Sequence, residues 1–215
     1  ATIVKRIGVI INPASGNGAG KIEGEKVITE LQRETEVLDL TGNSLVDSRG
    51  KAQAAINDLL IDGLVVVGGD GMAHLGVNLA MEFGLKFGII PCGTGNDTAR
   101  ALGLPIDDVV WATQIVLDHL KLPRRIDVGK GRTNERDFYF IGSVAAGLDS
   151  IVNSRANKMR FPKGPSRYRL ALYRELLKFK AIRYKLVVDG EYHETQAMLC
   201  SVTNVPSYGG GMLVT

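Results

Sequence analysis

The sequence contains few of the residues that build disulfide frameworks or metal centres. Of its 215 residues, 2 are cysteines and 3 are histidines. Cys92 and Cys200 lie far apart, and no His, Cys or carboxylate cluster has the spacing of a transition-metal site. No apolar run is long enough to cross a bilayer, and the N-terminus has no signal-peptide pattern. These absences predict a globular protein of a reducing, cytoplasmic compartment.

The small net charge of +3 conceals one strongly basic segment. Residues 158–185 contain ten Lys or Arg and one acidic residue, whereas the rest of the chain has more acids than bases. The basic residues of its expected helix that are candidates for a surface contact are Arg167, Arg169, Arg174 and Lys178. Three interpretations remain open: attachment to anionic lipid headgroups, contact with nucleic-acid phosphates, and a packing helix with a solvated charged face.

Strand-like and helix-like stretches alternate through the first two-thirds of the chain. Strands are predicted at residues 6–11, 36–40, 64–67 and 87–90. Helices are predicted at residues 21–33, 48–60, 72–83, 97–102 and 107–120. Within the second helix the expected apolar stripe is Ala52, Ala55, Ile56, Leu59 and Leu60. Alternation with short connections predicts an α/β fold with a doubly wound parallel sheet, which binds ligand at the carboxyl ends of its strands.

The pattern changes after about residue 122. Strands without intervening helices are predicted at residues 125–128, 137–144, 184–189 and 195–203, with Gly190 as a turn and one helix at 166–179. We therefore expect a nucleotide-binding domain at 1–122 and a mostly antiparallel second domain at 123–215. The last residues begin another strand, so we expect this second domain to be incomplete.

Two glycine-rich turns follow two short apolar strands and precede helices. They are Gly68-Gly69-Asp70-Gly71 and Pro91-Cys92-Gly93-Thr94-Gly95-Asn96-Asp97. At such a turn, unpaired backbone amides and the positive end of the helix dipole attract an anion. Two of them on one sheet predict a polyphosphate site.

A third loop, from Asn12 to Gly20, resembles a Walker A loop but fails its pattern. Ser15 or its neighbour stands where a glycine is needed, and Ile22 replaces the magnesium-binding hydroxyl. Neither this loop nor the one at residues 93–98 completes GxGxxG. These failures disfavour a dinucleotide oxidoreductase, which is kept only as a third alternative because Asp39 ends the second strand and could act as the ribose ligand.

Asp70 is a carboxylate placed among three glycines. It can accept a proton from an attacking hydroxyl or bind magnesium, or it can cap the next helix by accepting the N–H of Met72 or Ala73. Cys92, in the other turn, is either a stabilised thiolate or a small residue that fits a tight turn.

The three loops, in this order and spacing, resemble the diacylglycerol kinase catalytic-domain family, which includes bacterial soluble lipid kinases and sphingosine kinases. Residues 145–149 and Asn204 with Tyr208-Gly209-Gly210-Gly211 are similar to its later motifs. The resemblance implies an ATP-binding N-terminal domain and a β-sandwich C-terminal domain. It also implies magnesium-dependent phosphoryl transfer from ATP to a lipid hydroxyl, converting diacylglycerol to phosphatidate.

The resemblance also implies which residues contact the nucleotide. They are Asn12, Pro13, Ala14, Ser15, Gly16, Thr41, Gly68, Gly69, Asp70, Gly71, Met72, Ala73, His74, Thr94, Gly95 and Asn96. Asp70 would be catalytic, through the magnesium–phosphate group or by assisting deprotonation. Met72 stands where the family has threonine, and the family's Asp-Gly motif would lie beyond Thr215, so the metal ligands are unassigned.

A lipid kinase must reach an acceptor that stays in the bilayer. The resemblance therefore favours a lipid surface over nucleic acid as the partner of the basic segment, and predicts a cytoplasmic enzyme peripheral on the inner face of the membrane. Met72 and the expected incompleteness favour the alternative, a non-catalytic nucleotide-binding or membrane-binding module. Whether the protein forms a homodimer stays open.

Overall fold

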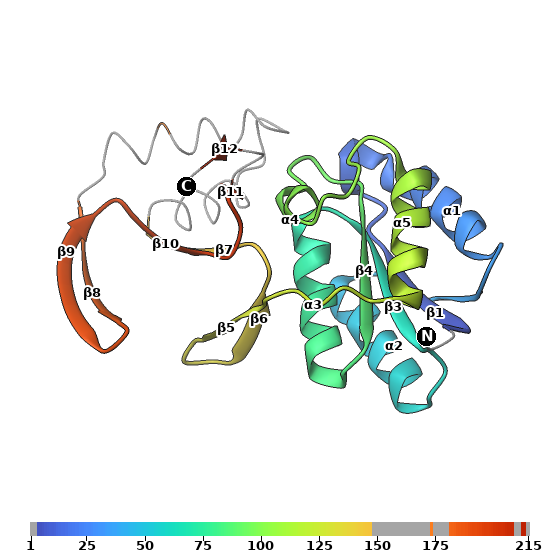
Figure 1. Cartoon of the computed structure of the whole chain (residues 1–215), viewed down its shortest axis with the longest axis horizontal. Helices are drawn as coiled ribbons and strands as arrows, with labels where there is room; N and C mark the ends of the chain where they lie inside the picture. Colours follow the sequence, from blue (N-terminus) through green and yellow to red (C-terminus); the bar gives the residue numbers. More distant parts are fainter. Residues whose placement is uncertain (1–3, 148–172, 174–180, 209–211, 214–215) are drawn as a thin grey trace. The chain divides into compact units, whose positions relative to one another are not determined.

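The computed structural model describes residues 4–147, 173, 181–208 and 212–213 (Figure 1). The chain divides into two compact units. Unit 1 comprises Ala1–Gly142 and Asn204–Thr215, and unit 2 comprises Ser143–Thr203. Each unit is described separately below. The domain boundary expected near residue 122 stays a prediction.

Unit 1 is built on a 4-stranded parallel sheet in the order β2-β1-β3-β4; β1, β3 and β4 are labelled in Figure 1. The strands are β1 (Arg6–Ile11), β2 (Glu36–Asp39), β3 (Gly63–Gly68) and β4 (Lys86–Pro91). Every residue of the central strand β3 is buried, as expected for a strand covered on both faces. The predicted doubly wound parallel sheet is confirmed.

Helices cover both faces of this sheet. Helices α1 (Gly20–Leu31) and α5 (Val109–Lys121) share a core with Val65 and Val67. Helices α2 (Leu45–Asn57) and α3 (Asp70–Phe83) share a second core with Leu64 and Val66. Successive residues of one strand thus serve opposite layers, because side chains alternate across a strand.

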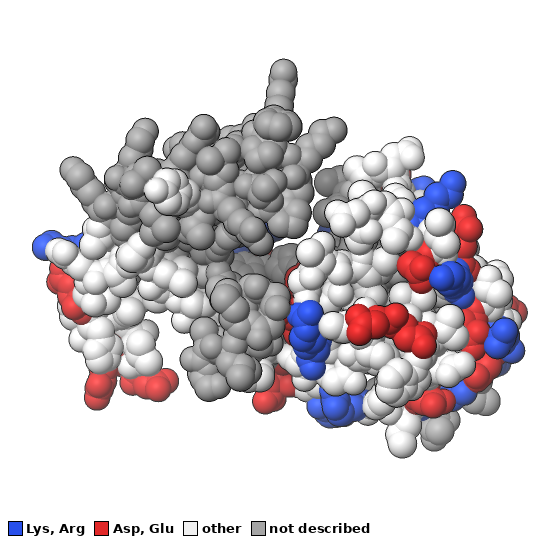
Figure 2. Space-filling model, turned by 90° about the horizontal axis from the view of Figure 1, so that it is seen from above, with Lys and Arg blue, Asp and Glu red and all other residues white. Residues whose placement is uncertain are grey.

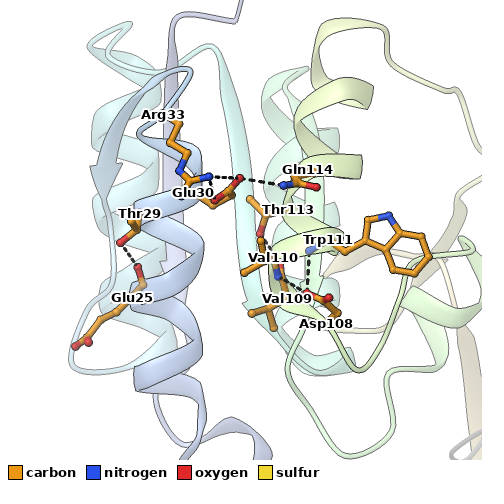
Figure 3. Close-up of polar contacts among 10 residues, drawn as sticks. All are labelled: Glu25, Thr29, Glu30, Arg33, Asp108, Val109, Val110, Trp111, Thr113 and Gln114. Carbon is orange, nitrogen blue, oxygen red and sulfur yellow. Dashed lines mark hydrogen bonds and ion pairs between the residues drawn. The ribbon is translucent and has the colours of Figure 1, made fainter.

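A buried carboxylate links the two helices of the first layer. Glu30 on α1 forms an ion pair with Arg33 at 3.1 Å and accepts a hydrogen bond from the Gln114 side chain on α5 at 3.2 Å (Figure 3). On α5, Asp108 caps the helix by accepting the N–H groups of Val110 and Trp111. The Glu30–Gln114 hydrogen bond therefore adds a polar link between α1 and α5, which share an apolar core.

The predicted bounds of α2 were wrong at both ends. The Ser44 hydroxyl accepts the N–H of Asp47 at 3.1 Å and starts the helix at Leu45, as N-cap serines do. The helix ends at Asn57, and Leu59 has a left-handed φ of 55°. Leu59 and Leu60 therefore leave the expected apolar stripe and are exposed.

A β-hairpin follows α5 and belongs to unit 1. Its strands are β5 (Gly129–Arg132) and β6 (Asp137–Phe140). The strand predicted at 125–128 was wrong, because regular pairing starts only where Gly129 and Gly131 face the rings of Phe140 and Phe138. The strand predicted at 137–144 is broken, since β6 ends before the buried Ile141.

Unit 2 consists, in its described part, of antiparallel pairs. Strand β7 (Ser143–Gly147) pairs with β10 (Leu199–Thr203), and β8 (Ile182–Val188) pairs with β9 (Glu191–Ala197). Gly190 lies in the β8–β9 turn with a φ of 89°, as predicted. The chain then returns to unit 1 with β11 (Ser207–Tyr208) and β12 (Met212–Leu213).

The helix expected at 166–179 lies outside the described residues, apart from Tyr173. None of the helices that the structure describes is long and apolar enough to cross a membrane.

Candidate functional site

Three loops of unit 1 converge at the carboxyl ends of β1, β3 and β4, where doubly wound sheets bind their ligands. They enclose a pocket of about 310 Å³. Its lining residues are Asn12, Ala14, Ser15, Gly16, Asn17, Leu45, Gly69, Gly71, Met72, Gly93 and Thr94. The structure thus brings together the three loops that the sequence singled out.

The first loop, between β1 and α1, is closed by Asn12. Its side-chain Oδ1 accepts the N–H of Ala14, and its carbonyl oxygen accepts the N–H of Ser15, both at 3.1 Å. Gly16 has a left-handed φ of 58°. A Cβ on Gly20 would lie 2.2 Å from the Asn12 carbonyl oxygen. The loop and the start of α1 (within it a short 3-10 turn, Ser15–Gly18) therefore form one compact turn.

The second and third loops touch through their glycines. A Cβ on Gly93 would lie 2.4 Å from the Cα of Gly69. The buried side chain of Asn96 holds the third loop closed, accepting the N–H of Gly93 at 2.9 Å and donating to its carbonyl at 2.8 Å. Two backbones in direct contact leave no space for a side chain at this point.

We expect Gly93→Ala to destabilise the protein by about 3 kcal/mol, because the new methyl must separate two packed backbones. Urea unfolding of the wild type and the variant measures the difference. The control is Gly50→Ala in α2, where a Cβ meets nothing within 4 Å. A Gly93→Ala protein as stable as the Gly50→Ala protein would contradict the close contact.

Asp70 begins α3, but its carboxylate reaches the neighbouring short helix α4 (Asp97–Ala101). Its Oδ1 accepts the N–H of Thr98 at 2.9 Å, and its Oδ2 accepts the N–H of Asp97 at 3.3 Å. The expected alternative, a cap on its own helix, is wrong, because the N–H groups of Met72 and Ala73 bond the Gly69 carbonyl. Asp70 instead ties the second loop to the third.

The Asp70 carboxylate keeps capacity for a further ligand. The residue is exposed, and an ionised carboxylate offers about four lone-pair sites, of which the two amides use only part. Gly95 lies against it, since a Cβ there would be 2.9 Å from Oδ2. A larger residue at position 95 would displace the carboxylate.

Met72 turns into the protein. It is 2% exposed and joins the core formed by α2 and α3. A Cβ on Gly68 would lie 2.4 Å from its Cγ, so the thioether side chain fills the space beneath the second loop. The pocket wall at this position is therefore apolar, where the resemblance implied a threonine hydroxyl.

Several predicted nucleotide contacts do not line the pocket: Pro13, Thr41, Gly68, Asp70, Ala73, His74, Gly95 and Asn96. The Thr41 hydroxyl accepts the N–H of Ile11 at 3.0 Å. His74 lies beside Phe138 of β6, with ring centroids 6.3 Å apart, and burial, helped by the charge of Arg136, lowers its pKa. Nucleotide contact by these residues stays a prediction.

Cys92 lies beneath the first loop, where a Cβ on Gly16 would be 3.0 Å from its carbonyl oxygen. The thiol is buried, and burial, with a smaller effect of Glu23, raises its pKa. A raised pKa keeps the thiol protonated. The structure therefore supports the small-residue interpretation over a stabilised thiolate.

Sequence reasoning missed Asn17, Leu45 and Gly93 as lining residues. Leu45 is the first residue of α2 and its side chain is 55% exposed. An apolar residue directly after the N-cap Ser44, at the carboxyl edge of the sheet, was the available signal. Leu45 provides the pocket with an apolar surface that can cover the face of a ligand.

The predicted membrane contacts, Arg167, Arg169, Arg174 and Lys178, lie outside the described residues. On the visible face of unit 1, basic and acidic side chains are interspersed (Figure 2). Nowhere in the described part of the chain do three or more His, Cys, Asp or Glu side chains gather in a way that could hold a metal ion.

A parallel sheet whose glycine-rich loops meet over one pocket is typical of nucleotide-binding α/β proteins. The chain belongs to the diacylglycerol kinase catalytic domain family, whose model matches residues 6–130. Residues 142–215 match a second family, the YegS C-terminal NAD kinase beta sandwich-like domain. The protein is accordingly a lipid kinase with a β-sandwich-like second domain.

Similar proteins carry names of the same kind. A protein of Mycobacterium tuberculosis named diacylglycerol kinase is 36% identical over 214 residues, covering 98% of this chain and 68% of the relative. A protein of the same name from Staphylococcus aureus is 30% identical over 199 residues, covering 91% of this chain and 61% of the relative.

The fold is also that of solved structures. One, described as the crystal structure of a diacylglycerol kinase from Bacillus anthracis, matches with a TM-score of 0.66 and 23% identity. The match covers 99% of this chain and 68% of that one. At this identity the likeness shows the fold alone.

Proposed function

We propose that the protein transfers the terminal phosphate of ATP to the hydroxyl of diacylglycerol, with magnesium, and forms phosphatidate. The uncharged, glycine-rich lining of the pocket carries this proposal. None of its lining residues among the described part of the chain is Lys or Arg. The charge of a polyphosphate would therefore be met by backbone amides and by a cation brought with the nucleotide.

The residues around the pocket fit magnesium. This ion takes one or two carboxylates, waters and substrate phosphates as ligands, and the exposed Asp70 carboxylate lies at the junction of two loops. When bound, magnesium neutralises phosphate oxygens as charge shifts during transfer. The two backbone N–H groups that donate hydrogen bonds to Asp70 fix the direction of its carboxylate.

The residues that line the pocket would orient the donor. Leu45 would cover one face of the base, while the loops that carry Gly16, Gly69 and Gly93 allow the phosphates to approach the backbone. Phosphoryl transfer depends chiefly on positioning and charge stabilisation. A site built from backbone turns held by Asn12, Asn96 and Asp70 suits that requirement.

The acceptor is proposed to stay in the membrane. Basic residues contribute on the order of 1 kcal/mol each near an anionic surface, and residues 158–185 carry ten of them. We infer that Arg167, Arg169, Arg174 and Lys178 contact this surface and that the enzyme is cytoplasmic and peripheral. The family membership and the excess of basic residues support this view.

The test is a transfer assay with the full-length protein, γ-labelled ATP and vesicles that contain one candidate lipid each. We expect magnesium-dependent labelling of diacylglycerol, stronger on vesicles with anionic lipid, and weaker after charge reversal at Arg167, Arg169 and Arg174. Labelling of a sphingoid base but not of diacylglycerol would show that the acceptor is a sphingoid base. Nucleotide binding with no labelled lipid would favour a non-catalytic module.

A further inference from the structure

Arg100 lies in the short helix α4 and binds back to the third loop. Its Nη1 donates to the Gly95 carbonyl oxygen and to the Asp97 carboxylate, the second at 3.3 Å. The side chains of Arg100 and Asp97 are only 33% and 15% exposed. Hydrogen bonds from an ionised donor are stronger than neutral ones, and partial burial reduces their screening by solvent. Arg100 does not line the pocket, so its charge serves the loop itself.

The segment that this arginine holds also carries the two amides that bind Asp70. The N–H of Asp97 donates to Oδ2 of Asp70 at 3.3 Å, and the N–H of Thr98 donates to Oδ1 at 2.9 Å. Gly95 lies against the same carboxylate, since a Cβ there would be 2.9 Å from Oδ2. The backbone of residues 95–98 therefore determines where the Asp70 carboxylate points.

This backbone has a conformation that its surroundings must maintain. Asn96 has a left-handed φ of 56°, which is costly for a residue other than glycine and persists where neighbouring contacts hold it. The Asn96 side chain bonds the N–H and the carbonyl of Gly93 and so fixes the first half of the loop. Arg100 fixes the second half, the half that contacts Asp70.

We propose that Arg100 is a positioning residue for phosphoryl transfer and acts through Asp70. By holding residues 95–98 in shape, it keeps the Asp70 carboxylate directed for the magnesium–nucleotide complex. The inference rests on the proposed function and adds a residue outside the pocket to its donor site. It predicts a lower kcat and a larger magnesium requirement, with no change in the affinity for metal-free ATP, which the backbone amides of the loops would bind.

The first test compares Arg100→Ala and Arg100→Lys with the wild type, all as full-length protein. We expect Arg100→Ala to lower kcat on diacylglycerol about tenfold, as for a displaced reacting group, and to raise the magnesium concentration for half-maximal turnover by about the same factor. The dissociation constant for metal-free ATP, measured by calorimetry, should stay within about twofold. Lysine keeps the charge but lacks the planar fork of donors, so it should restore only part of the loss.

The matched control is Arg124→Ala. The Arg124 guanidinium also donates to a backbone carbonyl, that of Leu102, at 3.0 Å. Leu102 is the C-cap of α4, so this bond lies at the other end of the helix from the segment that binds Asp70. Its loss should leave both kcat and the magnesium requirement equal to those of the wild type.

A double-mutant cycle with Asp70→Asn tests whether Arg100 acts through Asp70. Residues that act through one another are not additive, so Arg100→Ala should lower kcat by less than about twofold in the Asp70→Asn background. Hydrogen exchange of the nucleotide-free protein, followed by NMR, gives a readout without turnover. In Arg100→Ala the amides of Asp97 and Thr98 should exchange faster, while that of Gly93, which Asn96 holds, should not change.

An unchanged kcat in Arg100→Ala would overturn the proposal, and so would a full tenfold loss in the Asp70→Asn background. An equal loss of affinity for metal-free ATP would also overturn it, because it would indicate a general defect of the loops. If Arg100→Ala does not fold, Arg100→Lys takes its place in every comparison. A wild-type enzyme inactive on every lipid would overturn the proposed function, whereas unchanged exchange at Asp97 and Thr98 would overturn the link from Arg100 to Asp70.

Discussion

Replacing Asp70 by asparagine is expected to lower kcat on diacylglycerol by a factor on the order of 10³, close to the loss in Asp70→Ala, because transfer needs the negative charge. The two variants should differ in stability. Asparagine keeps an oxygen that can accept the Thr98 N–H, whereas alanine removes both bonds to α4 and costs about 1 kcal/mol, as lost caps do. Steady-state kinetics and urea unfolding measure the two effects separately.

The matched control for this prediction is Glu82→Gln, a carboxylate-to-amide change near the other end of α3. Glu82 pairs with Arg49 at the surface, and such pairs contribute little, so its turnover should equal that of the wild type. Near-normal turnover in Asp70→Asn, together with low turnover in Asp70→Ala, would show that Asp70 acts only as a cap on α4.

We expect Gly71→Ala to weaken nucleotide binding without lowering the stability of the protein. Gly71 lies in the first turn of α3 and lines the pocket, and a Cβ on it meets no atom within 4 Å. Alanine should therefore stabilise the ligand-free protein by up to about 1 kcal/mol, the helix propensity difference. The methyl group would occupy space that the phosphates need, and we expect the affinity for magnesium–ATP to fall by about 100-fold.

Gly50→Ala is the control, because Gly50 is also helical with open space around its Cβ, on α2 and away from the pocket. It should show the same gain in stability with unchanged affinity. Calorimetric titration and urea unfolding of both variants give the comparison. Equal nucleotide affinities in the two variants would show that the phosphates do not approach the second loop.

Patterns within a single segment predicted most of the fold. The continuous apolar runs of β3 and β4 could be identified because strands buried on both faces need no alternation. The three loops of the site were identified because glycine, asparagine and aspartate cluster where strands end. Local patterns failed where a structure depends on a distant partner. The pairing of β5, for instance, starts at glycines that face Phe138 and Phe140.

The hydrogen-bond partners of the site residues could not be predicted from the sequence, for the same reason. The amides that donate to Asp70 lie 27 and 28 residues away, so the only backbone contact that the sequence could offer, beside a proton-accepting or magnesium-binding role, was a cap on its own helix. Leu45 was missed because the predicted start of α2, residue 48, is three residues too late. The prediction therefore did not identify Leu45 as the first residue of the helix, where it lines the pocket.

The central claim is that the loops at residues 12–18, 68–72 and 93–98 hold the phosphates of the donor. Hydrogen exchange of the full-length protein, measured with and without magnesium–ATP, tests it most directly. We predict slower exchange in all three segments, with residues 44–46 as the fourth protected segment and no change at the turn of the β8–β9 hairpin. If magnesium–ATP does not slow hydrogen exchange in these three loops while the enzyme still phosphorylates lipid, the claim is contradicted.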